Sequence, residues 1–330
     1  MPTQRDVARE AGVSSATVSR YLNNPEILSP EIAIKVKDAI DKLGYRLDFY
    51  AQSLKTGKYY RIGIISASIG AFYMEMLRYI EDYLSEFGYF VNVSFSRYHE
   101  TTSRKTVDFI RNKQADGFII FPRLLDEDDE IIDNLINFNE KFVVIDRYLN
   151  NDKIYQVRID NYKAGRFAAE VLLDKGHKEF LFVWGHTDIL SSHERFDGFC
   201  DKLKESGIEL SSDRQINGEF DADFTYNIII EKFESLPAFT AVFCSNDLSA
   251  SGFIKACNNL GKKVGTDYSI IGFDDDIHSR YMTPSLSTFR QPLQEMGEKA
   301  AEILIDLIED RPVNERIVSY DAEFIQRESS

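Results

Sequence analysis

Apolar side chains recur at helical spacing in two short segments near the N-terminus. Val7 and Ala11 lie four residues apart, as do Val18 and Leu22, so each segment can bury one face of a helix. A glycine stands between the segments, in the run 12–14, where a tight turn is expected. The pattern predicts two short helices joined by a turn, the arrangement called a helix-turn-helix.

Polar side chains indicate where these two helices begin and which face stays in solvent. Thr3 and Ser14 each precede a helix, and a hydroxyl in that position accepts a hydrogen bond from a free backbone N–H group. In DNA-binding proteins of this kind, the second helix lies in the major groove. Small side chains allow its close approach, and an arginine can bond a guanine edge or a phosphate. The outer side of the second helix holds Ser15, Ala16, Thr17, Ser19 and Arg20.

A third helix is predicted at 30–43. Ser29 supplies its N-cap, Pro30 takes the first helical position, and Gly44 ends it. The order and spacing of these elements resemble the LacI/GalR family of sugar- and purine-responsive transcription factors. Besides the three helices, the resemblance is carried by the runs 22–25, 43–45 and 51–57 and by an apolar strand that begins at 61.

The resemblance implies that residues 48–60 form a hinge helix and linker, which folds only with DNA and a dimer mate. Leu54 resembles the wedge with which this family opens a central base step in the minor groove, and Lys55 would hold the adjacent phosphate. We therefore expect a homodimer on an inverted-repeat DNA operator. The residues predicted to contact or position DNA are Thr3, Ser14, Ser15, Ala16, Thr17, Ser19, Arg20, Asn23, Tyr45, Ala51, Leu54 and Lys55.

From residue 61 onward, short apolar runs alternate with amphipathic segments, a pattern that predicts parallel sheets built from βαβ units. Two such sets in tandem predict an α/β fold with two Rossmann-like lobes. The resemblance implies a type I periplasmic-binding-protein-like body that crosses between the lobes near 158–162, 287–292 and 318–322. Strands are expected at 62–65, 90–95, 117–121, 142–145, 180–184, 241–244 and 269–273, and helices at 74–87, 164–175, 249–260 and 296–308.

Three parts are thus expected along the chain. Residues 1–47 form the all-α DNA-binding headpiece, 48–60 the hinge, and 61–330 the effector-binding and dimerisation domain. Within that domain, we expect an N-lobe of about 61–158 and 291–318 and a C-lobe of about 162–288 and 322–330.

Polar side chains follow several of the apolar runs, and the carboxyl ends of parallel strands are where ligands bind in such sheets. By the resemblance, Arg195 and Asp274 bind effector hydroxyls or a base, and Phe220 stacks on the effector. Carboxylate, guanidinium and aromatic groups together suit a polyol. Asp247 and Asp275 also follow strands but are equally well explained as helix caps. The candidate effector-binding residues are Ser68, Phe72, Tyr73, Arg147, Arg195, Phe220, Asn246 and Asp274.

The net charge of −15 is unusual for a DNA-binding protein until it is divided along the chain. Residues 1–60 hold nine Lys or Arg and seven Asp or Glu, a local charge of +2, which leaves −17 for the rest. Attraction to phosphate is therefore local to the headpiece. Three unclustered cysteines and five scattered histidines predict reduced core thiols, no structural metal and no cofactor. With no transmembrane run and no signal-peptide core, we expect a cytoplasmic protein that does not enter membranes.

The predicted function is that of a transcription regulator, a repressor whose operator affinity is controlled allosterically by a small sugar or sugar phosphate. An alternative in the same family is a corepressor-type regulator that responds to a purine or nucleoside. A solute-binding protein would share the body but would need a signal peptide in place of 1–60. An enzyme would need a nucleophile–base pair or a phosphate loop, and no G-x-S-x-G, Walker-type or dinucleotide glycine pattern is present, so we expect no enzymatic activity.

Overall fold

The computed structural model describes residues 2–46, 57–66, 70–95, 100–121, 130–149, 151–187 and 189–330. The chain divides into two units, Met1–Tyr59 and Tyr60–Ser330. The predicted boundary between headpiece and hinge stays a prediction, because residues 47–56 lie outside the described part.

The first unit is built from three helices, α1 (Gln4–Ala11), α2 (Ser15–Asn23) and α3 (Pro30–Leu43), with a short 3-10 turn, η1 (Pro25–Ile27), between the last two. The three predicted helices are confirmed. The side chains that α1, α2 and α3 bury against one another form a small core of Val7, Ala8, Val18, Val36 and Ala39.

Two of the three predicted N-caps make their side-chain hydrogen bond, whereas Ser29 precedes α3 without one. The Thr3 hydroxyl accepts a hydrogen bond from the Asp6 N–H at 3.4 Å, and the Asp6 carboxylate accepts one from the Thr3 N–H at 2.9 Å, which completes a capping box. The Ser14 hydroxyl accepts a hydrogen bond from the Thr17 N–H at 3.1 Å. Each such cap stabilises a helix by about 1 kcal/mol. The caps therefore matter in a unit with so small a core.

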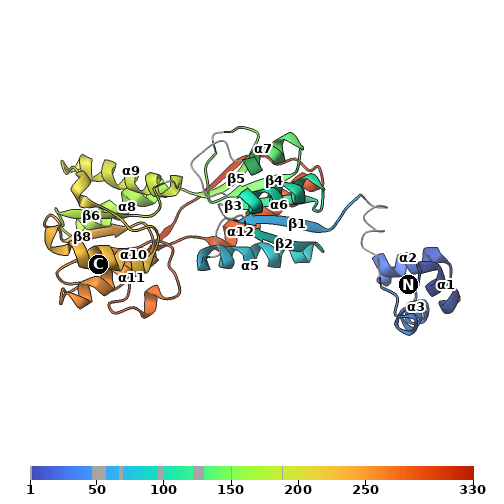
Figure 1. Ribbon diagram of the computed structural model, residues 1–330. Coiled ribbons are helices and arrows are strands. Elements are labelled where there is room, and N and C mark those ends of the chain that lie inside the picture. Colours follow the sequence, from blue (N-terminus) through green and yellow to red (C-terminus); the bar gives the residue numbers. More distant parts are fainter. Residues whose placement is uncertain are drawn as a thin grey trace. The chain divides into compact units, whose positions relative to one another are not determined.

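In the second unit, the N-lobe is formed by a six-stranded sheet in the order β11-β5-β4-β3-β1-β2, and every neighbouring pair of strands is parallel (Figure 1). Helices cover both faces, so β3 and β4 are buried along their whole length and read as continuous apolar runs. The strands are β1 (Arg61–Ser66), β2 (Phe90–Phe95), β3 (Gly117–Phe121), β4 (Phe142–Ile145), β5 (Tyr155–Ile159) and β11 (Ile317–Tyr320); the helices are α5 (Ala71–Glu86), α6 (Glu100–Arg111), α7 (Glu130–Asn137) and α12 (Leu293–Ile308).

Successive side chains of the buried strands enter different cores, as the pleat requires. Ile119 and Val143 pack with α5 and α12, whereas Phe118, Ile120 and Val144 pack with α6 and α7. Two helices therefore cover each face of the sheet and pack on the side chains that point toward it (Figure 1).

The C-lobe repeats the design with a parallel four-stranded sheet in the order β7-β6-β8-β9. A separate antiparallel pair, β10 and β12, adjoins it. The strands are β6 (Phe180–Trp184), β7 (Gln215–Asn217), β8 (Ala241–Cys244), β9 (Ser269–Ile271), β10 (Thr288–Arg290) and β12 (Glu323–Ile325); the helices are α8 (Asn161–Asp174), α9 (Leu190–Glu205), α10 (Ala222–Lys232) and α11 (Asp247–Asn259), with single 3-10 turns η2 (Ser212–Arg214), η3 (Phe233–Ser235) and η4 (Ser279–Tyr281).

The predicted strand at 269–273 is two residues too long. β9 ends at Ile271 because the backbone then turns to a new partner. Gly272 N–H donates to the Ser287 carbonyl and Asp274 N–H to the Phe289 carbonyl, both at the segment that contains β10. The last polar residues of this stretch are therefore held by the strand that leads back to the N-lobe.

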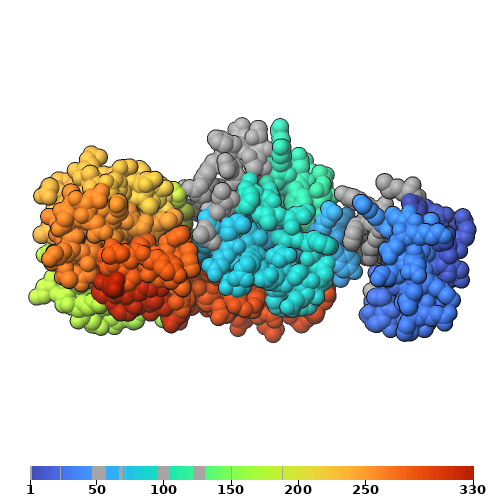
Figure 2. All heavy atoms as spheres, turned by 90° about the horizontal axis from the view of Figure 1, so that it is seen from below, coloured from blue at the N-terminus to red at the C-terminus, as the bar shows by residue number. Residues whose placement is uncertain are grey.

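Sheet membership places three passages of the chain between the lobes: after Ile159, after Arg290 and after Tyr320. The C-terminal segment, coloured orange-red to red, consequently contributes to the surface of both lobes (Figure 2). Three connections at one edge leave relative rotation of the lobes as the accessible motion.

Helices α8 and α9 cross at backbone contact. A Cβ at Gly165 would lie 2.1 Å from the Arg195 carbonyl oxygen, and a Cβ at Gly198 would lie 2.0 Å from the Tyr162 carbonyl oxygen. Both distances are far below van der Waals contact, so these positions require glycine. The crossing fixes how far α9 stands from α8, and α9 carries Arg195.

We expect Gly165→Ala to lower the free energy of unfolding by about 1 to 3 kcal/mol, because the added methyl must push α9 away. Urea unfolding followed by the fluorescence of Trp184, which packs on Phe196 of α9 at 4.3 Å between ring centres, measures this. Asp174→Ala, at the exposed end of α8, is the control and should change stability little. Wild-type stability in Gly165→Ala would contradict the close crossing.

Candidate functional site

The strand orders of both lobes reverse direction at one point, beside β1 in the N-lobe and beside β6 in the C-lobe. Ligands of such sheets bind at the carboxyl ends of the strands next to the reversal. A cleft of about 600 Å³ lies there. The described residues that line it are Gly70, Phe72, Tyr73, Glu75, Asp146, His186, Ile189, Ser191, Arg195, Glu219, Phe220, Asp221, Asn246, Asp247, Leu248, Asp274, Asp275, Asp276, Ile277, His278, Gln291 and Leu293.

Arg195 is the central cation of the cleft. Only 4% of the residue is exposed, and its guanidinium lies 3.6 Å from the ring centre of Phe273. Its Nε donates to Asn161 Oδ1 at 2.9 Å and its Nη1 to the Ser245 carbonyl at 2.6 Å. Burial lowers the pKa of Arg195, while Asp274 and other nearby carboxylates oppose that shift. The contacts hold the guanidinium in one orientation, facing the cleft.

Asp274 lies on the same wall, just beyond β9. Its backbone has a φ of 117°, a strained value for a residue with a side chain, and its carboxylate accepts a hydrogen bond from Gln291 Nε2 at 2.8 Å. Burial raises the pKa of Asp274 to about 7, with the charge of Arg195 acting in the opposite direction. Because Gln291 belongs to a passage between the lobes, this hydrogen bond links the Asp274 carboxylate to a connection between them.

Asp146, the first residue after β4, completes a trio with Arg195 and Asp274. Its Oδ1 is buried and has no hydrogen-bond partner among the described residues, and burial raises its pKa to about 6. The sequence placed Asp146 after a strand but named its neighbour Arg147 as the candidate. The signal that could have identified Asp146 is its position as the first polar residue beyond an apolar run.

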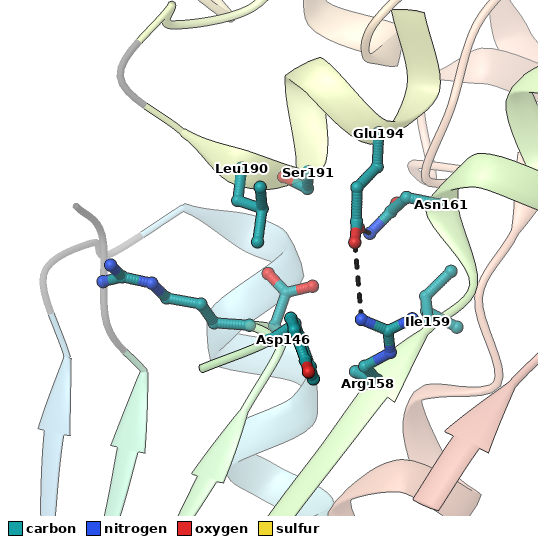
Figure 3. A pocket seen from close by; sticks show the side chains of 9 residues that line it. Asp146, Arg158, Ile159, Asn161, Leu190, Ser191 and Glu194 are labelled. Atoms are coloured by element: carbon teal, nitrogen blue, oxygen red, sulfur yellow. Dashed lines mark hydrogen bonds and ion pairs between the residues drawn. The ribbon is translucent and has the colours of Figure 1, made fainter. Parts of the chain in front are cut away.

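Arg147 is not among the residues lining the cleft. It lines a smaller adjoining pocket of about 10 Å³, room for about one water molecule. Figure 3 shows this pocket, with Asp146 opposite Glu194 and an ion pair of 3.3 Å between Arg158 and Glu194. Asn161 also donates to Glu194, at 3.3 Å. Whether Arg147 contacts an effector stays a prediction.

Aromatic side chains enter the cleft from both lobes. Phe72 and Tyr73, at the start of α5, meet edge to face with ring centres 5.0 Å apart, and Tyr73 packs on Phe121 in the same way at 5.7 Å. Phe220 comes from the C-lobe, where its ring meets His186 edge to face at 5.6 Å. The structure therefore brings together the three aromatic residues named from the sequence.

The carboxyl ends of β8 and β9 are joined by side-chain hydrogen bonds. Asn246 caps α11 by accepting from the Ser249 N–H at 2.9 Å, so the cap is Asn246 rather than Asp247. The buried Asp247 carboxyl accepts from Thr288 Oγ1 and Ser279 Oγ at 2.5 Å and from the Asp276 N–H at 2.9 Å. Burial raises the pKa of Asp247 to about 8.

Asp275 is likewise no helix cap. Its carboxylate pairs with Arg290 at 2.8 Å and with Arg327 at 2.5 Å, and only 3% of its side chain is exposed. These ion pairs join the loop after β9 to β10 and to the C-terminal segment. Asp275 therefore serves the structure of the C-lobe.

The headpiece presents a second candidate site on α2. Ser15, Ala16 and Arg20 are exposed there, and Thr17 and Ser19 are half-buried on the same helix. Tyr45 packs against the headpiece core, and Thr3 is exposed at the start of α1. The side chain of Asn23 and the residues Ala51, Leu54, Lys55 and Ser68 lie outside the described part, so their predicted roles stay predictions.

The described residues also bear on metal binding, disulfide formation and membrane insertion. They contain no group of three or more His, Cys, Asp or Glu side chains arranged to hold a metal ion. All three cysteines are free, and burial raises the pKa of the Cys257 thiol to about 12. Within the described ranges, no helix has the length and apolar character needed to cross a membrane.

Comparisons with known proteins cover the whole chain. Residues 3–48 match the family model described as "Bacterial regulatory proteins, lacI family", and residues 169–330 match a "Periplasmic binding protein-like domain". An HTH-type transcriptional regulator RegA of Clostridium saccharobutylicum is 30% identical over 99% of this chain and 98% of its own. An HTH-type transcriptional repressor PurR of Pectobacterium atrosepticum is 28% identical over 100% of this chain and 97% of its own.

Among solved structures, a lac repressor dimer bound to operator and the anti-inducer ONPF superposes with a TM-score of 0.88. It is 24% identical, and the alignment covers 99% of this chain and 98% of that one. The α/β fold with a helix-turn-helix headpiece, predicted from the sequence, is thereby confirmed.

The raised pKa of Asp247 predicts a pH-dependent stability. Between about pH 4 and pH 8, the unfolded carboxyl is ionised while the folded one keeps its proton, so stability falls as pH rises, by up to about 1.4 kcal/mol per pH unit. Asp247→Asn imitates the protonated group. We expect its stability to exceed that of the wild type progressively from pH 5.5 to 7.5, as measured by urea unfolding at each pH.

Asp174→Asn, on the exposed end of α8, is the control and should follow the wild-type profile. Parallel pH profiles for the wild type and Asp247→Asn would show that Asp247 is ionised in the folded protein, contrary to this expectation.

Proposed function

Because the chain belongs to the lacI family of bacterial regulatory proteins, we propose that it is a homodimeric repressor that binds an inverted-repeat operator under the control of a sugar or sugar phosphate held between its lobes. The chain is a DNA-binding transcription regulator, not an enzyme. The observation that carries the effector part of the proposal is the arrangement of Arg195, Asp274 and Asp146 in the interlobe cleft.

The trio offers both kinds of hydrogen bond that a polyol needs. The guanidinium of Arg195 donates, and the carboxylates of Asp274 and Asp146 accept, so neighbouring hydroxyls of one ring can each find a partner. An aromatic ring suits the apolar face of a sugar, and Phe220 supplies one. The effector therefore makes contacts with both lobes when they close on it.

Lobe closure is also how effector binding would alter the affinity for the operator. An effector that binds one lobe arrangement more tightly shifts the population toward it, and the N-lobe, which follows the hinge in the chain, then changes how the two headpieces of a dimer approach each other. Leu54 in the hinge is the residue we propose as the minor-groove wedge.

Large apolar side chains on the surface support the dimer. On the C-lobe, Tyr281 is 76% exposed, and Leu248 and Ile277 are about half exposed. The hydrogen bonds of Asp247 to Asp276 and Ser279 hold the start of α11 against this loop. Leu248 and Ile277 also line the interlobe cleft, which leaves Tyr281 as the side chain that we assign to the dimer surface. Exposed apolar surface marks a protein interface.

A regulator of bacterial DNA works in the cytoplasm, which is where we place this protein.

A purine or nucleoside corepressor is the second candidate effector. The observation in its favour is the presence of aromatic rings on both lobes, Phe72 and Tyr73 on one and Phe220 on the other, because a flat base stacks between two such walls. Tightened operator binding on addition of the ligand would indicate this alternative.

The effector site is tested by Arg195→Ala and Asp274→Ala. We expect each to leave operator binding without effector near the wild-type level, but to weaken binding of the effector found by screening at least tenfold, because one partner of its hydroxyls is lost. Calorimetry and operator binding measure the two effects. Arg311→Ala, beyond the end of α12, is the control. Unaltered effector affinity in both variants would place the effector elsewhere.

The DNA site is tested on α2. We expect Arg20→Ala to weaken operator binding by about 1 to 3 kcal/mol, whereas Lys37→Ala, which removes an exposed charge from α3, should have a smaller effect. Replacing Ser15 and Ala16 together should change the half-site sequence selected from a random DNA library. Selection of the wild-type consensus by that double variant would exclude α2 as the recognition helix.

A further inference from the structure

The charge of the interlobe cleft limits the effectors that it can hold. Its described lining contains eight carboxylic acids but only one arginine or lysine, Arg195. A sugar and its phosphate ester have the same hydroxyls to offer, but the ester adds close to two negative charges. The distribution of charge around the cleft therefore distinguishes the two.

We propose that the cleft takes an uncharged polyhydroxylated or heterocyclic ring and rejects its phosphorylated form. The inference rests on the proposed function, because it concerns the same site, and it narrows the effector to one charge class.

Arg195 is badly placed to bind a phosphate. Arginine binds phosphate best through a fork, which is a pair of parallel N–H groups. A guanidinium offers two such forks: Nε pairs with one terminal nitrogen, and the two terminal nitrogens pair with each other. Here Nε donates to Asn161, which occupies the fork that includes Nε, and one of the two N–H groups of Nη1 donates to the Ser245 carbonyl. The remaining N–H groups suit a hydroxyl oxygen, which needs a single donor.

Among the described residues that line the cleft, no second lysine or arginine balances the acids next to Arg195. Asp146 and Asp274 both interact with Arg195, and its one positive charge cannot neutralise two carboxylates. By contrast, Asp275 is paired with Arg290 and Arg327 and contributes little net charge. A phosphate in the cleft would face, at short range, the negative charge that Arg195 leaves unbalanced.

Three further acids of the lining, Glu75, Asp221 and Asp276, form no ion pair with a described lysine or arginine. Asp221 instead caps α10, accepting from the Phe224 N–H at 2.7 Å, which places a carboxylate at a helix N-terminus that could otherwise attract an anion. The N-termini of α5 and α9 also adjoin the cleft and lack side-chain caps, but each contributes only about half a positive charge. The balance remains negative.

The test measures stability and binding of the full-length protein with matched ligand pairs. The pairs are glucose with glucose 6-phosphate, ribose with ribose 5-phosphate, and adenosine with adenosine monophosphate; inorganic phosphate is compared with chloride at equal ionic strength. We expect each phosphorylated member to bind at least tenfold more weakly than its uncharged partner where that partner binds, and inorganic phosphate to raise the melting temperature no more than chloride.

A variant with less charge should relax this selection. In Glu75→Gln/Asp221→Asn/Asp276→Asn, the amides keep the hydrogen-bonding shape, and asparagine caps a helix as well as aspartate does. We expect the ratio of the two affinities, uncharged over phosphorylated, to fall at least threefold. The reason is that the phosphorylated member, for example ribose 5-phosphate, should bind more tightly to the variant. The matched control removes the same charge from exposed positions away from the cleft, as Asp174→Asn/Glu209→Gln/Glu231→Gln, and should leave discrimination unchanged.

The outcomes separate this inference from the proposed function. If a phosphorylated ligand or inorganic phosphate binds as tightly as the uncharged compounds, and Arg195→Ala abolishes that binding, the charge selection is overturned while a sugar-type effector site remains. If uncharged rings bind and their phosphates do not, the inference holds. If only adenosine binds, the inference holds and the sugar assignment fails in favour of the second candidate.

Discussion

The C-lobe is organised around one buried cation. A guanidinium removed from water is costly unless its donors are satisfied, and Arg195 meets this need through Asn161 at the start of α8 and the Ser245 carbonyl at the end of β8. Its face is covered by Phe273, just beyond β9. A single side chain of α9 therefore depends on three other elements of the lobe, and they in turn are arranged to accommodate it.

The glycines at the crossing of α8 and α9 belong to the same constraint. Only with Gly165 and Gly198 in contact with the opposite backbone can α9 come near enough for Arg195 to reach Asn161. The close approach is decided by the backbone, and the hydrogen bond follows from it. Packing and binding chemistry are thus fixed by the same few positions, and the cleft wall is rigid where its cation is presented.

Negative charge surrounds this cation, and the imbalance links the site to the rest of the molecule. The body carries all of the excess acid, whereas the headpiece is slightly basic, so DNA meets favourable charge only at the headpiece. Within the cleft, burial raises the pKa values of Asp146, Asp274 and Asp247 toward neutrality, and neighbouring carboxylates add to the shift. Asp274 is hydrogen-bonded to Gln291 in a passage between the lobes. Asp247 is hydrogen-bonded to Ser279 in the loop that bears Tyr281. The cleft, a passage between the lobes and the loop that bears Tyr281 are joined through these carboxylates.

The sequence by itself determined the local elements. Capping hydroxyls at Thr3 and Ser14 and apolar runs such as 117–121 and 241–244 are written in adjacent residues, and the helices and strands they predict are present. Residue order also placed Asn246 and Asp274 after strands, hence at the cleft. Short edge elements such as β7 and β12 were missed, because three half-exposed residues carry no clear period and pair only when a distant strand is in place.

Only the tertiary structure decided which polar groups share an environment. Nothing near Asp146 in the chain indicates that it faces Arg195, or that Arg147 turns to a smaller pocket, because those directions depend on how α9 is set against β4 and β5. Asp247 and Asp275 look alike in sequence, yet one is held by hydroxyls and the other by two arginines from β10 and the C-terminal segment. Charge compensation is a property of neighbours in space, and those neighbours come from parts of the chain that only the fold brings together.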